Sequence, residues 1–403
     1  MNELSKSVLF SSLPSFISSV EATMILMVIP LIAKDFSITY IKASTILSIY
    51  IVTEVLLSIP FSLLAEKVGV KMVIILGTMI MALSSFLIIF SNSFLLILIL
   101  RIFQGIGASM VLLTSLSYAS LIGSDKERGK MIGLNHTIVS LGYVFGLPLG
   151  GIIAEINWKY LFAITSVLSF ISLFLILSLN EVHAKSGLGI NIIYTSLIFD
   201  GIILGLYYPL FLLLSLVGLV MTLWKIKLGK VFYLTSLSGF LHSITRNMIA
   251  AFFVFYLYSL HLPALIIGSL VLLYPLSFTF VSFYAGKLHD KYKLRVASFG
   301  FASMALSSLS LFFNVILGEF LLGASSGIAT TSNTAYTMSS VRNKDRIVAS
   351  GIRSVQGVVS NTIGLIIASY FRTFLTPYVE ITVLLNLASL LILGIVIFSQ
   401  ANT

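Results

Sequence analysis

The sequence predicts an all-α polytopic membrane protein. Of its 403 residues, 58% are hydrophobic and 9% are charged, whereas a soluble domain has about 25% charged residues. At least ten apolar runs approach or exceed the roughly 20 residues that a helix needs to cross a bilayer. The strands of a membrane barrel would instead alternate polar and apolar residues, so helices are expected throughout.

Fourteen spans are predicted from the apolar runs and from the charged, proline or glycine residues that bound them. They cover residues 8–32, 41–65, 72–91, 94–122, 130–155, 158–180, 190–207, 209–226, 231–260, 263–287, 295–313, 315–341, 346–372 and 377–399. The first run contains Glu21 and is too long for the core of a signal peptide, so it is expected to remain as the first span.

Two of these spans, 190–207 and 209–226, form a central hairpin. About 35 nearly uninterrupted apolar residues are too many for a cytoplasmic linker and suffice for two short spans. Tyr207, Tyr208 and Pro209 are expected to turn the hairpin at the outer interface. Because a hairpin returns the chain to the same side, a twelve-span alternative stays open, in which the hairpin lies flat in the inner leaflet.

The basic residues predict the orientation of the spans. If the N-terminus is cytoplasmic, seventeen lysines and arginines fall in cytoplasmic segments, and only Lys34, Lys42, Lys159 and Arg372 fall outside. This positive-inside bias places both termini in the cytoplasm. The net charge of +10 is therefore explained by topology and is no sign of nucleic-acid binding.

The second half of the chain repeats the first. A shift of 218 residues superposes Gly105 on Gly323, Tyr118 on Tyr336, Lys126 on Lys344, Glu127 on Asp345, Arg128 on Arg346 and Gly133 on Gly351. A shift of 224 superposes Glu66, Lys67 and Lys71 on Asp290, Lys291 and Arg295. Two six-span bundles, residues 1–182 and 230–403, are therefore predicted, with residues 183–229 as an inserted transmembrane hairpin and linker.

One apolar run carries a charge beside small residues, in Arg101-Ile-Phe-Gln-Gly-Ile-Gly-Ala108. A charged loop, Ser124 to Lys130, separates it from a run that contains Gly142, Gly146, Pro148, Gly150 and Gly151. Three of these glycines recur every four residues and share one helix face, where another helix can approach closely.

The two runs together resemble spans 4 and 5 of the major facilitator superfamily. There, an Arg-x-x-Gln-Gly segment precedes a charged loop and a glycine–proline antiporter motif. In this chain Leu147 occupies the usual proline position and Pro148 follows it. A proline kink displaced by one residue is therefore expected.

Two loops, Ser62 to Lys71 and Gly286 to Arg295, resemble the superfamily's loop between spans 2 and 3. The resemblance implies a cytoplasmic charge latch formed by Glu66, Lys67, Lys71, Asp290, Lys291 and Arg295. A carboxylate there can accept hydrogen bonds from a helix N-terminus or pair with a basic neighbour, and such bonds break when the two halves rock. For any single charge, a solvated positive-inside loop is the alternative.

The first span resembles the signature of the fourteen-span drug:proton antiporter branch of the superfamily. Glu21 stands where the branch has an aspartate, followed by Thr23 and Pro30, and Leu26 replaces the usual asparagine. The segment from Asn157 to Phe162 resembles the same branch's entry to span 6. The resemblance covers nearly the whole chain and implies a two-bundle major facilitator fold with proton-driven export.

Charges inside predicted spans point to mechanism, because each costs at least about 2.5–3.5 kcal/mol at a helix centre. Glu21, Glu54 and Arg101 are predicted at comparable depth and are the candidate proton-coupling residues. A carboxylate near an arginine, in a cavity that is alternately wet and dry, can bind and release protons. A structural pair with Arg101 is the alternative for Glu21. A substrate-cation site and a buried structural carboxylate are the alternatives for Glu54.

Other polar residues within spans have less specific roles. His242 and Arg246 lie four residues apart on one helix face, where they either line a substrate cavity or make packing hydrogen bonds. Asp200 is expected to cap a neighbouring helix, and Glu319 and Arg353 are expected as gate residues. Aromatic residues that could line the cavity include Tyr118, Tyr143 and Tyr336, with Phe145, Tyr256, Tyr274 and Phe278. Most aromatic residues in such a chain face lipid or neighbouring helices instead.

The sequence contains no nucleotide-binding loop, no metal-ligand spacing, no nucleophile–base arrangement and no cysteine. No cofactor or metal is therefore expected. A membrane-embedded enzyme that uses carboxylates and histidine for acid–base chemistry and a non-transporting receptor are the alternatives outside transport.

These features predict a monomeric, plasma-membrane transporter that exports small amphipathic compounds in exchange for protons by alternating access. Its expected partners are the small-molecule substrate, protons and the lipid bilayer, without nucleic acid. Uptake of a small metabolite by proton symport is the alternative.

The fourteen-span topology predicts that a tag inserted after Gly187 and a tag at Lys227 are both cytoplasmic, with Tyr208 external, because the hairpin crosses the membrane twice. Site-directed labelling from each side of the membrane measures this. Labelling of a Tyr208→Cys variant from the inside only would instead favour the hairpin lying flat in the inner leaflet.

Overall fold

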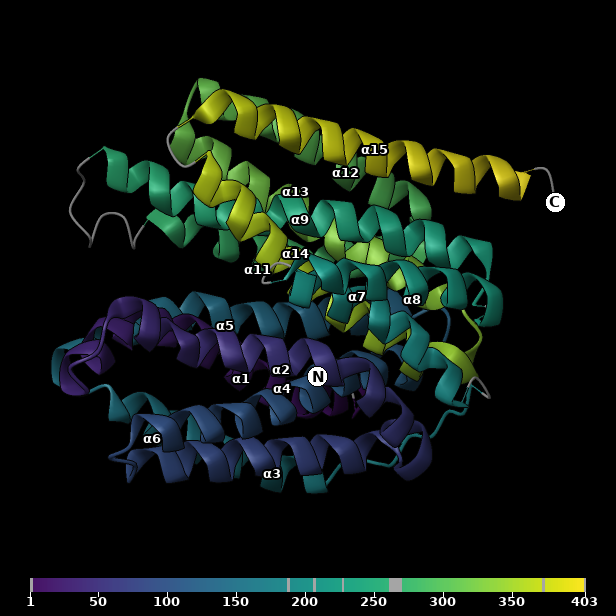
Figure 1. Cartoon of the computed structure of the whole chain (residues 1–403). Coiled ribbons are helices and arrows are strands. Elements are labelled where there is room, and N and C mark those ends of the chain that lie inside the picture. Colours follow the sequence, from purple (N-terminus) through teal and green to yellow (C-terminus); the bar gives the residue numbers. More distant parts are fainter. Residues whose placement is uncertain are drawn as a thin grey trace. The chain divides into compact units, whose positions relative to one another are not determined.

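The computed structural model describes residues 3–186, 189–205, 208–226, 228–260, 270–371 and 374–401. All the regular elements in these residues are helices (Figure 1). The α-helices are α1 (Glu3–Asp35), α2 (Tyr40–Val68), α3 (Val70–Ile89), α4 (Phe94–Ile122), α5 (Arg128–Ile156), α6 (Lys159–Leu177), α7 (Ile193–Gly205), α8 (Leu212–Lys225), α9 (Lys230–Ser259), α11 (Leu273–Tyr292), α12 (Leu294–Leu309), α13 (Val315–Ser339), α14 (Arg346–Tyr370) and α15 (Leu375–Ala401). Nine helical segments in this part of the chain are long and apolar enough to cross a membrane, which confirms a polytopic helical membrane protein.

The helices coincide with the predicted spans to within a few residues at most ends. The largest differences are at α1, which begins at Glu3 and continues through Pro14 and Pro30, and at α11, which ends five residues after the predicted end at 287. Prolines are tolerated inside membrane helices because neighbouring groups satisfy the freed backbone. The predicted start of span 263–287 lies outside the described residues. Tyr207, Lys227 and Arg372, which belong to the predicted hairpin turn and to the count of basic residues, also lie outside them.

The helices pack as two compact units. Unit 1 comprises Met1–Ala119, Ile138–Lys227 and Asn343–Val355, and unit 2 comprises Ser120–Thr137, Leu228–Arg342 and Gln356–Thr403. Each sequence half therefore supplies most of one unit, but the beginning of α5 packs in unit 2 and the beginning of α14 packs in unit 1. The beginnings of α5 and α14 correspond under the 218-residue shift, so each sequence half contributes the same segment to the opposite unit.

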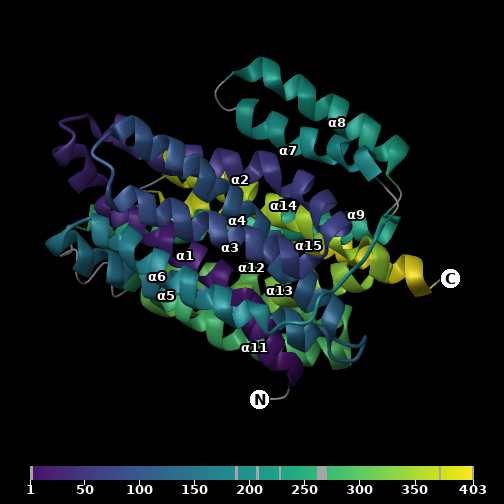
Figure 2. The same ribbon diagram turned by 90° about the horizontal axis from the view of Figure 1, so that it is seen from below.

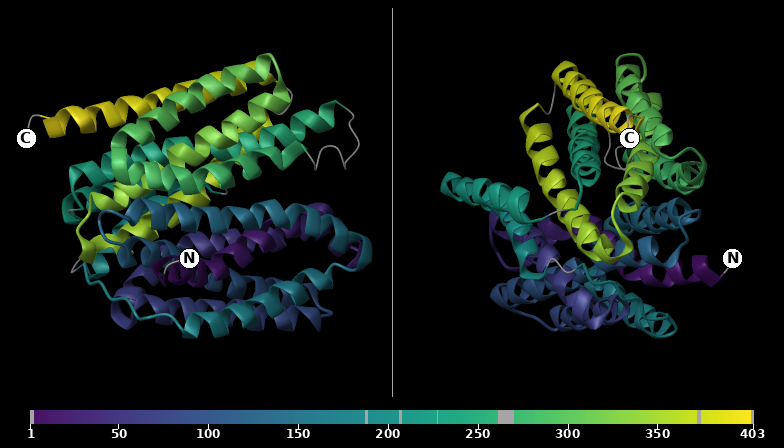
Figure 3. Two further views of the ribbon diagram at one scale, coloured as in Figure 1. Left: turned by 180° about the vertical axis from the view of Figure 1, so that it is seen from behind. Right: turned by 90° about the vertical axis from the view of Figure 1, so that its right-hand side faces the viewer.

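Equivalent helix pairs form in the two units. In unit 1, α3 packs on α6 and α6 on α1, and in unit 2, α12 packs on α15 and α15 on α9 (Figure 3). A Cβ at Gly105 of α4 would lie 2.7 Å from the Tyr50 carbonyl oxygen of α2. Gly323 of α13 makes the same close approach to the Tyr274 carbonyl of α11. Small residues therefore set the helix spacing in both units, as is common in membranes.

The turns after α2 and α11 also occupy equivalent positions. Gly69 has a φ of 102° and Lys293 a φ of 52°, and the two residues are 224 positions apart. At Gly69 a side chain would meet the Glu181 carboxylate, whose Cδ lies 2.5 Å from the position of a Cβ. Lys293 combines this positive φ with a ψ of −126°, a conformation that is uncommon for a non-glycine residue.

The α7–α8 hairpin packs on α2 within unit 1, and its two helices lie side by side (Figure 2). Gly201 and Gly218 bring the helices together, because a Cβ at Gly218 would lie 2.7 Å from the Ile198 backbone nitrogen. Helices of 13 and 14 residues extend for about 20 Å, which is less than the roughly 30 Å hydrocarbon core. Each is preceded by a 3₁₀ turn, Gly189–Ile192 or Pro209–Phe211, which lengthens the arm.

The glycine stripe of α5 packs against α1 in unit 1. A Cβ at Gly142 would lie 2.5 Å from the Phe16 carbonyl oxygen, and one at Gly150 would lie 3.0 Å from the Met24 Cα. At Gly146 it would overlap the Thr23 side chain and lie 2.7 Å from the Val20 carbonyl oxygen. The predicted shared face of these glycines is thus the α1 contact. Gly151 has open space around it, and Pro148 is exposed.

Gly146→Ala is expected to destabilise the protein by about 1–3 kcal/mol, because the new methyl group overpacks the α1–α5 contact. Gly151→Ala is the matched control on the same helix. It meets no atom within 4 Å and should leave stability unchanged or slightly raise it through better helix propensity. Thermal unfolding of the detergent-solubilised variants measures the difference, and equal midpoints would contradict this account of the stripe.

Candidate functional site

A buried ion pair lies at the centre of unit 1. Glu21 of α1 is 2% exposed and Arg101 of α4 is 0% exposed, and Arg101 Nη1 donates to Glu21 Oε1. A cluster of buried apolar side chains from α1 to α6 includes Met24, Ile46 and Phe162. Two opposite charges removed from water in this way must neutralise each other, because neither has bulk solvent to stabilise it.

Other polar groups hold the Arg101 side chain in place. Its Nε donates to the Ile46 carbonyl at 3.1 Å, its Nη1 to Gln104 Oε1 at 2.8 Å, and its guanidinium carbon lies 4.4 Å from the centre of the Tyr50 ring. The face of an aromatic ring attracts a cation, so Tyr50 adds to the stabilisation. Arg101 Nη2 is buried without a hydrogen-bond partner in the described residues.

Gln104 links the ion pair to α3. Its Nε2 donates to Ser85 Oγ at 2.6 Å and to Glu21 Oε2 at 3.4 Å. The last two residues of the Arg-x-x-Gln-Gly segment therefore have different roles: Gln104 extends the ion-pair network, and Gly105 lets α2 approach closely. The network can change its charge only at Glu21, because arginine stays protonated in proteins.

Glu54 lies one turn beyond Tyr50 on α2 and is 5% exposed. Its carboxylate makes no hydrogen bond or ion pair with the described residues, although it interacts electrostatically with Tyr50. It is therefore near the Glu21–Arg101 pair without being part of it.

In unit 2, His242 belongs to a buried hydrogen-bond network. Asn386 donates its amide to Thr245 Oγ1 at 3.2 Å, so its Oδ1 is the acceptor at 2.8 Å from His242 Nδ1. Nδ1 therefore carries the proton, and Nε2, 3.2 Å from Ser326 Oγ, can accept from that hydroxyl. Arg246, four residues further along α9, is half-buried with its guanidinium 6.0 Å from the Phe278 ring centre.

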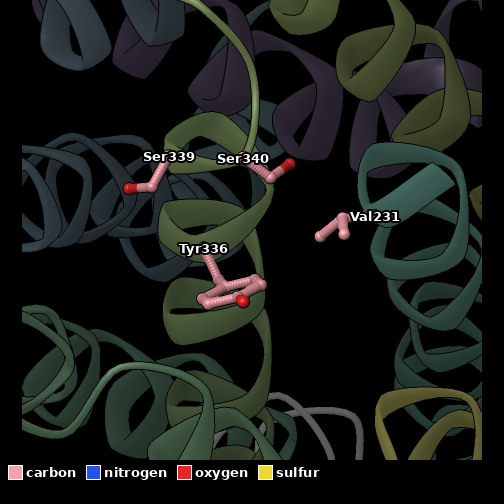
Figure 4. Close-up of a pocket in the computed structure, with 4 residues that line it drawn as sticks. All are labelled: Val231, Tyr336, Ser339 and Ser340. Atoms are coloured by element: carbon pink, nitrogen blue, oxygen red, sulfur yellow. The ribbon is translucent and has the colours of Figure 1, made fainter. Parts of the chain in front are cut away.

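The candidate cavity aromatics lie in different surroundings. Tyr118 is fully buried and donates to the Asn180 carbonyl at 3.1 Å, whereas Tyr143 is 44% exposed. Tyr336 lines a cavity of about 180 Å³ with Ser339 and Ser340, at the end of α13, and Val231 of α9 (Figure 4). Ligand pockets usually measure about 300–1,000 Å³, so this cavity is too small for a drug-sized compound.

The latch carboxylate Asp290 binds the beginning of a helix. Its Oδ1 accepts from the Gly129 backbone N–H at 2.7 Å and its Oδ2 from the Lys130 N–H at 2.8 Å, both in the first turn of α5. The negative charge also interacts favourably with the positive end of the helix dipole. Gly129 is needed there because a Cβ would meet Asp290 Oδ1 at 2.6 Å.

The other latch residues make different contacts. Glu66 accepts from the Ser186 backbone N–H at 3.1 Å, and Lys71 Nζ donates to the Leu177 and Leu179 carbonyls at 2.9 and 2.6 Å, at the end of α6. Lys67, Lys291 and Arg295 are exposed.

Three further residues around these loops make contacts that were not predicted from the sequence. Glu181 accepts from the Lys71 and Met72 backbone N–H groups at 2.8 and 3.2 Å, so it caps α3 as Asp290 caps α5. Arg128 is 3% exposed and pairs with Asp125. His289 is 1% exposed, and both of its ring nitrogens lack hydrogen-bond partners in the described residues. Only the position of His289 beside Asp290 could have marked it.

The ionisation states of the latch follow from burial. His289 and Asp290 lie beyond the predicted end of their span, at 287. Burial lowers the pKa of His289 to about 4, with Lys293 and Arg128 contributing, so the ring is neutral at pH 7. Burial raises the pKa of Asp290, while its two backbone hydrogen bonds oppose the rise. Because His289 is neutral, it carries no charge at the start of α5. Asp290 is the residue that accepts hydrogen bonds from the first turn of that helix.

Residues 12–232 and 235–401 match the Major Facilitator Superfamily. The chain belongs to this superfamily. Members of this superfamily are transporters and not enzymes, so the predicted two-bundle major facilitator fold and the absence of an enzymatic role are confirmed. The finer assignment to its fourteen-span antiporter branch stays a prediction.

Two curated relatives match 161 residues, or 40%, of this superfamily member. The riboflavin transporter RibZ of Clostridioides difficile is 32% identical over 35% of its length. The quinolone resistance protein NorA of Staphylococcus aureus is 24% identical over 41% of its length. The chain thus spans less than half the length of these relatives.

Solved structures show the same fold. The human organic anion transporter MFSD10 superposes with a TM-score of 0.76 at 16% identity, covering 98% of this chain and 100% of that one. The proton:xylose symporter XylE superposes with a TM-score of 0.71 at 13% identity, covering 96% and 94%. These likenesses establish the two-bundle major facilitator architecture.

Asp290→Asn is expected to slow transport more than it weakens substrate binding, because the amide loses the charge that stabilises the first turn of α5 in this conformation. Lys291→Gln, an exposed neighbour, is the matched control. Initial transport rates and equilibrium binding of one transported dye compare the variants. Parental rates in Asp290→Asn and in Glu66→Gln alike would remove the latch role.

Proposed function

We propose that this superfamily member exports small amphipathic compounds in exchange for protons. The single observation that supports this best is the buried Glu21–Arg101 pair, which joins a titratable carboxylate to a permanent cation in the interior of unit 1. Protonation of Glu21 would remove the partner of Arg101, so the network has two charge states with different internal bonding.

The two charge states provide a way to couple protons to transport. With Glu21 ionised, the carboxylate binds Arg101 and Gln104 together. A proton on Glu21 weakens both contacts, while Arg101 keeps the Ile46 carbonyl and the Tyr50 ring. A substrate whose charge or polarity favours one of these states then competes with the proton, as antiport requires.

Asp290 would couple this change to alternating access. Its bonds to Gly129 and Lys130 stabilise one arrangement of α5 and α11. A conformational change that separates these helices must break two charge-assisted hydrogen bonds, so the latch biases the equilibrium without touching the substrate.

Proton symport of a small metabolite is the second candidate. The relative named as a riboflavin transporter supports only the choice of a small metabolite as substrate, whereas the relative named as a quinolone resistance protein supports a drug as substrate. Export by a monomer in the plasma membrane, with cytoplasmic termini and fourteen spans, belongs to the proposal. The cytoplasmic termini follow from the distribution of basic residues, and the fourteen spans from the exposed apolar face of α8, which includes Leu213, Leu216 and Val220.

Transport in proteoliposomes tests the direction of coupling. A panel containing ethidium, a quinolone and riboflavin is offered under a pH gradient of either sign. Antiport predicts that the substrate moves against the proton gradient, and symport predicts movement with it. If a compound is transported at the same rate whichever sign the pH gradient has, proton coupling is excluded.

Glu21→Gln is expected to abolish proton-driven transport and to flatten the pH dependence of binding, because the titrating group is gone. Arg101 then lacks a counter-charge, and loss of one partner of a buried pair costs about 3–5 kcal/mol, so the variant should also be less stable. The double variant Glu21→Gln/Arg101→Gln removes both charges and should recover stability without recovering coupling.

Two variants complete this experiment. Glu21→Asp keeps a carboxylate that is one methylene shorter and should retain part of the activity. Glu380→Gln neutralises an exposed carboxylate on α15 and should behave as the parent. If Glu21→Gln drives uphill transport at the parental rate and pH profile, coupling resides elsewhere.

A further inference from the structure

A buried histidine lies at the contact between α11 and the beginning of α5, within unit 2. His289 is 1% exposed, and neither of its ring nitrogens has a hydrogen-bond partner in the described residues. A Cβ placed on Gly129 would lie 3.0 Å from His289 Cδ2, so the backbone of the first turn of α5 covers part of the imidazole ring. The burial of the ring therefore depends in part on this turn.

The two helices meet backbone to backbone beside this histidine. A Cβ at Gly286 of α11 would overlap the Gly129 carbonyl oxygen of α5, and a Cβ at Gly133 would lie 2.8 Å from the Ser282 carbonyl oxygen. Asp290 adds its two hydrogen bonds to the first turn of α5 at the same place. The histidine and the capping carboxylate therefore share one helix contact, and both lose it when the helices separate.

The charged and titratable groups around His289 disfavour an imidazolium. Arg128 at the start of α5 and Lys293 in the turn before α12 both act on the ring with positive charge. From α13, Tyr336 meets the ring edge to face, with ring centroids 6.2 Å apart. On α11 itself, the Asp290 carboxylate is bonded to the first turn of α5. A charged imidazole would face two cations without a hydrogen-bond acceptor in the described residues, so the neutral ring is the form that fits.

We infer that His289 makes the contact between α5 and α11 a pH-sensitive switch, which the neutral histidine allows to close and the protonated histidine opens. When the first turn of α5 moves away from α11, the imidazole gains contact with water and its distance from Arg128 increases. It can then take up a proton, as an exposed histidine does near neutral pH. Because the open contact binds a proton that the closed contact does not, acidification shifts the equilibrium towards the open form.

The pH range of the switch follows from the two states of the histidine. In the closed contact, burial lowers the pKa of His289 from its ordinary value of 6.5 to about 4. In the open contact the exposed ring returns to its ordinary pKa. The closed form therefore binds fewer protons, and its advantage is lost progressively as the pH falls through 6.5. The ratio of open to closed molecules should rise about tenfold between pH 7.5 and pH 5.5.

The switch is a means of regulation and is separate from proton coupling. The loop after α11 belongs to the predicted cytoplasmic side, so His289 takes its proton from the cytoplasm and returns it there. Acidification of the cytoplasm would then make the latch open more readily without moving a proton across the membrane. This role in transport rests on the proposed function of Asp290, whereas the opening of the contact can be measured without transport.

Spin-label distances between α5 and α11 test the switch directly. The chain contains no cysteine, so labels can be placed at Lys126→Cys and Lys291→Cys, two exposed positions before α5 and on α11. Pulsed electron paramagnetic resonance of the full chain in lipid nanodiscs, without substrate, then measures the open population at pH 7.5 and pH 5.5. The parent should show the tenfold rise. His289→Phe keeps an aromatic ring without a titrating group and should lose most of it, whereas His183→Gln, at an exposed histidine of unit 1, should keep it.

Two further measurements separate the histidine from the carboxylate beside it. Asp290→Asn should raise the open population at both pH values but keep the rise between them, because the histidine remains. Exchange of the imidazole C2 hydrogen, followed by mass spectrometry of the parent chain, reports the accessibility and the pKa of each histidine and needs no variant to fold. His289 should exchange several-fold more slowly than His183 and should titrate at a lower pH.

The outcomes distinguish this inference from the proposed function. An equal rise of the open population in the parent and in His289→Phe would overturn the switch, and so would equal exchange rates and titration midpoints for His289 and His183. A rise that depends on His289, together with substrate flux that ignores the pH gradient, would retain the switch and reject proton-coupled export.

Discussion

A charge buried among membrane helices must be paired or neutralised, and the interior of both units depends on this constraint. In unit 1, Arg101 is completely buried and is tolerated because Glu21, Gln104 and the Tyr50 ring surround it. In unit 2, Glu319 is equally buried without a counter-charge in the described residues. An ion pair meets this requirement in unit 1.

Close backbone contact makes such burial possible. The glycines of α4, α5 and α13 let neighbouring helices approach until their carbonyl oxygens lie where a Cβ would be. Membrane helices gain little from the hydrophobic effect between them, so this packing supplies much of their association. Glu21 and Glu319 are both buried among these closely packed helices. The polar groups then interact with protein partners alone, which makes their protonation sensitive to small helix movements.

Asp290 contacts the beginning of α5, a helix whose two ends belong to different units. Asp290 binds the beginning of α5, and this segment packs in unit 2 although the rest of α5 packs against α1 in unit 1. One continuous helix therefore contacts Asp290 near its start and the helix of Glu21 near its end.

The sequence by itself determined the class, the helices and the repeat, because apolar length, small-residue spacing and charge position are local properties of the chain. It also placed Glu21 and Arg101 at one depth and predicted that Asp290 could bind a helix N-terminus. Only the tertiary structure decided which partners these groups meet: Gln104 and Tyr50 at Arg101, the first turn of α5 at Asp290, and Glu181 over Gly69. Such partners lie up to about 160 residues apart, and no local pattern records a distance between side chains on different helices. For the same reason the shift of 218 aligned Arg101 with Glu319, but only packing showed that one is paired and the other is not.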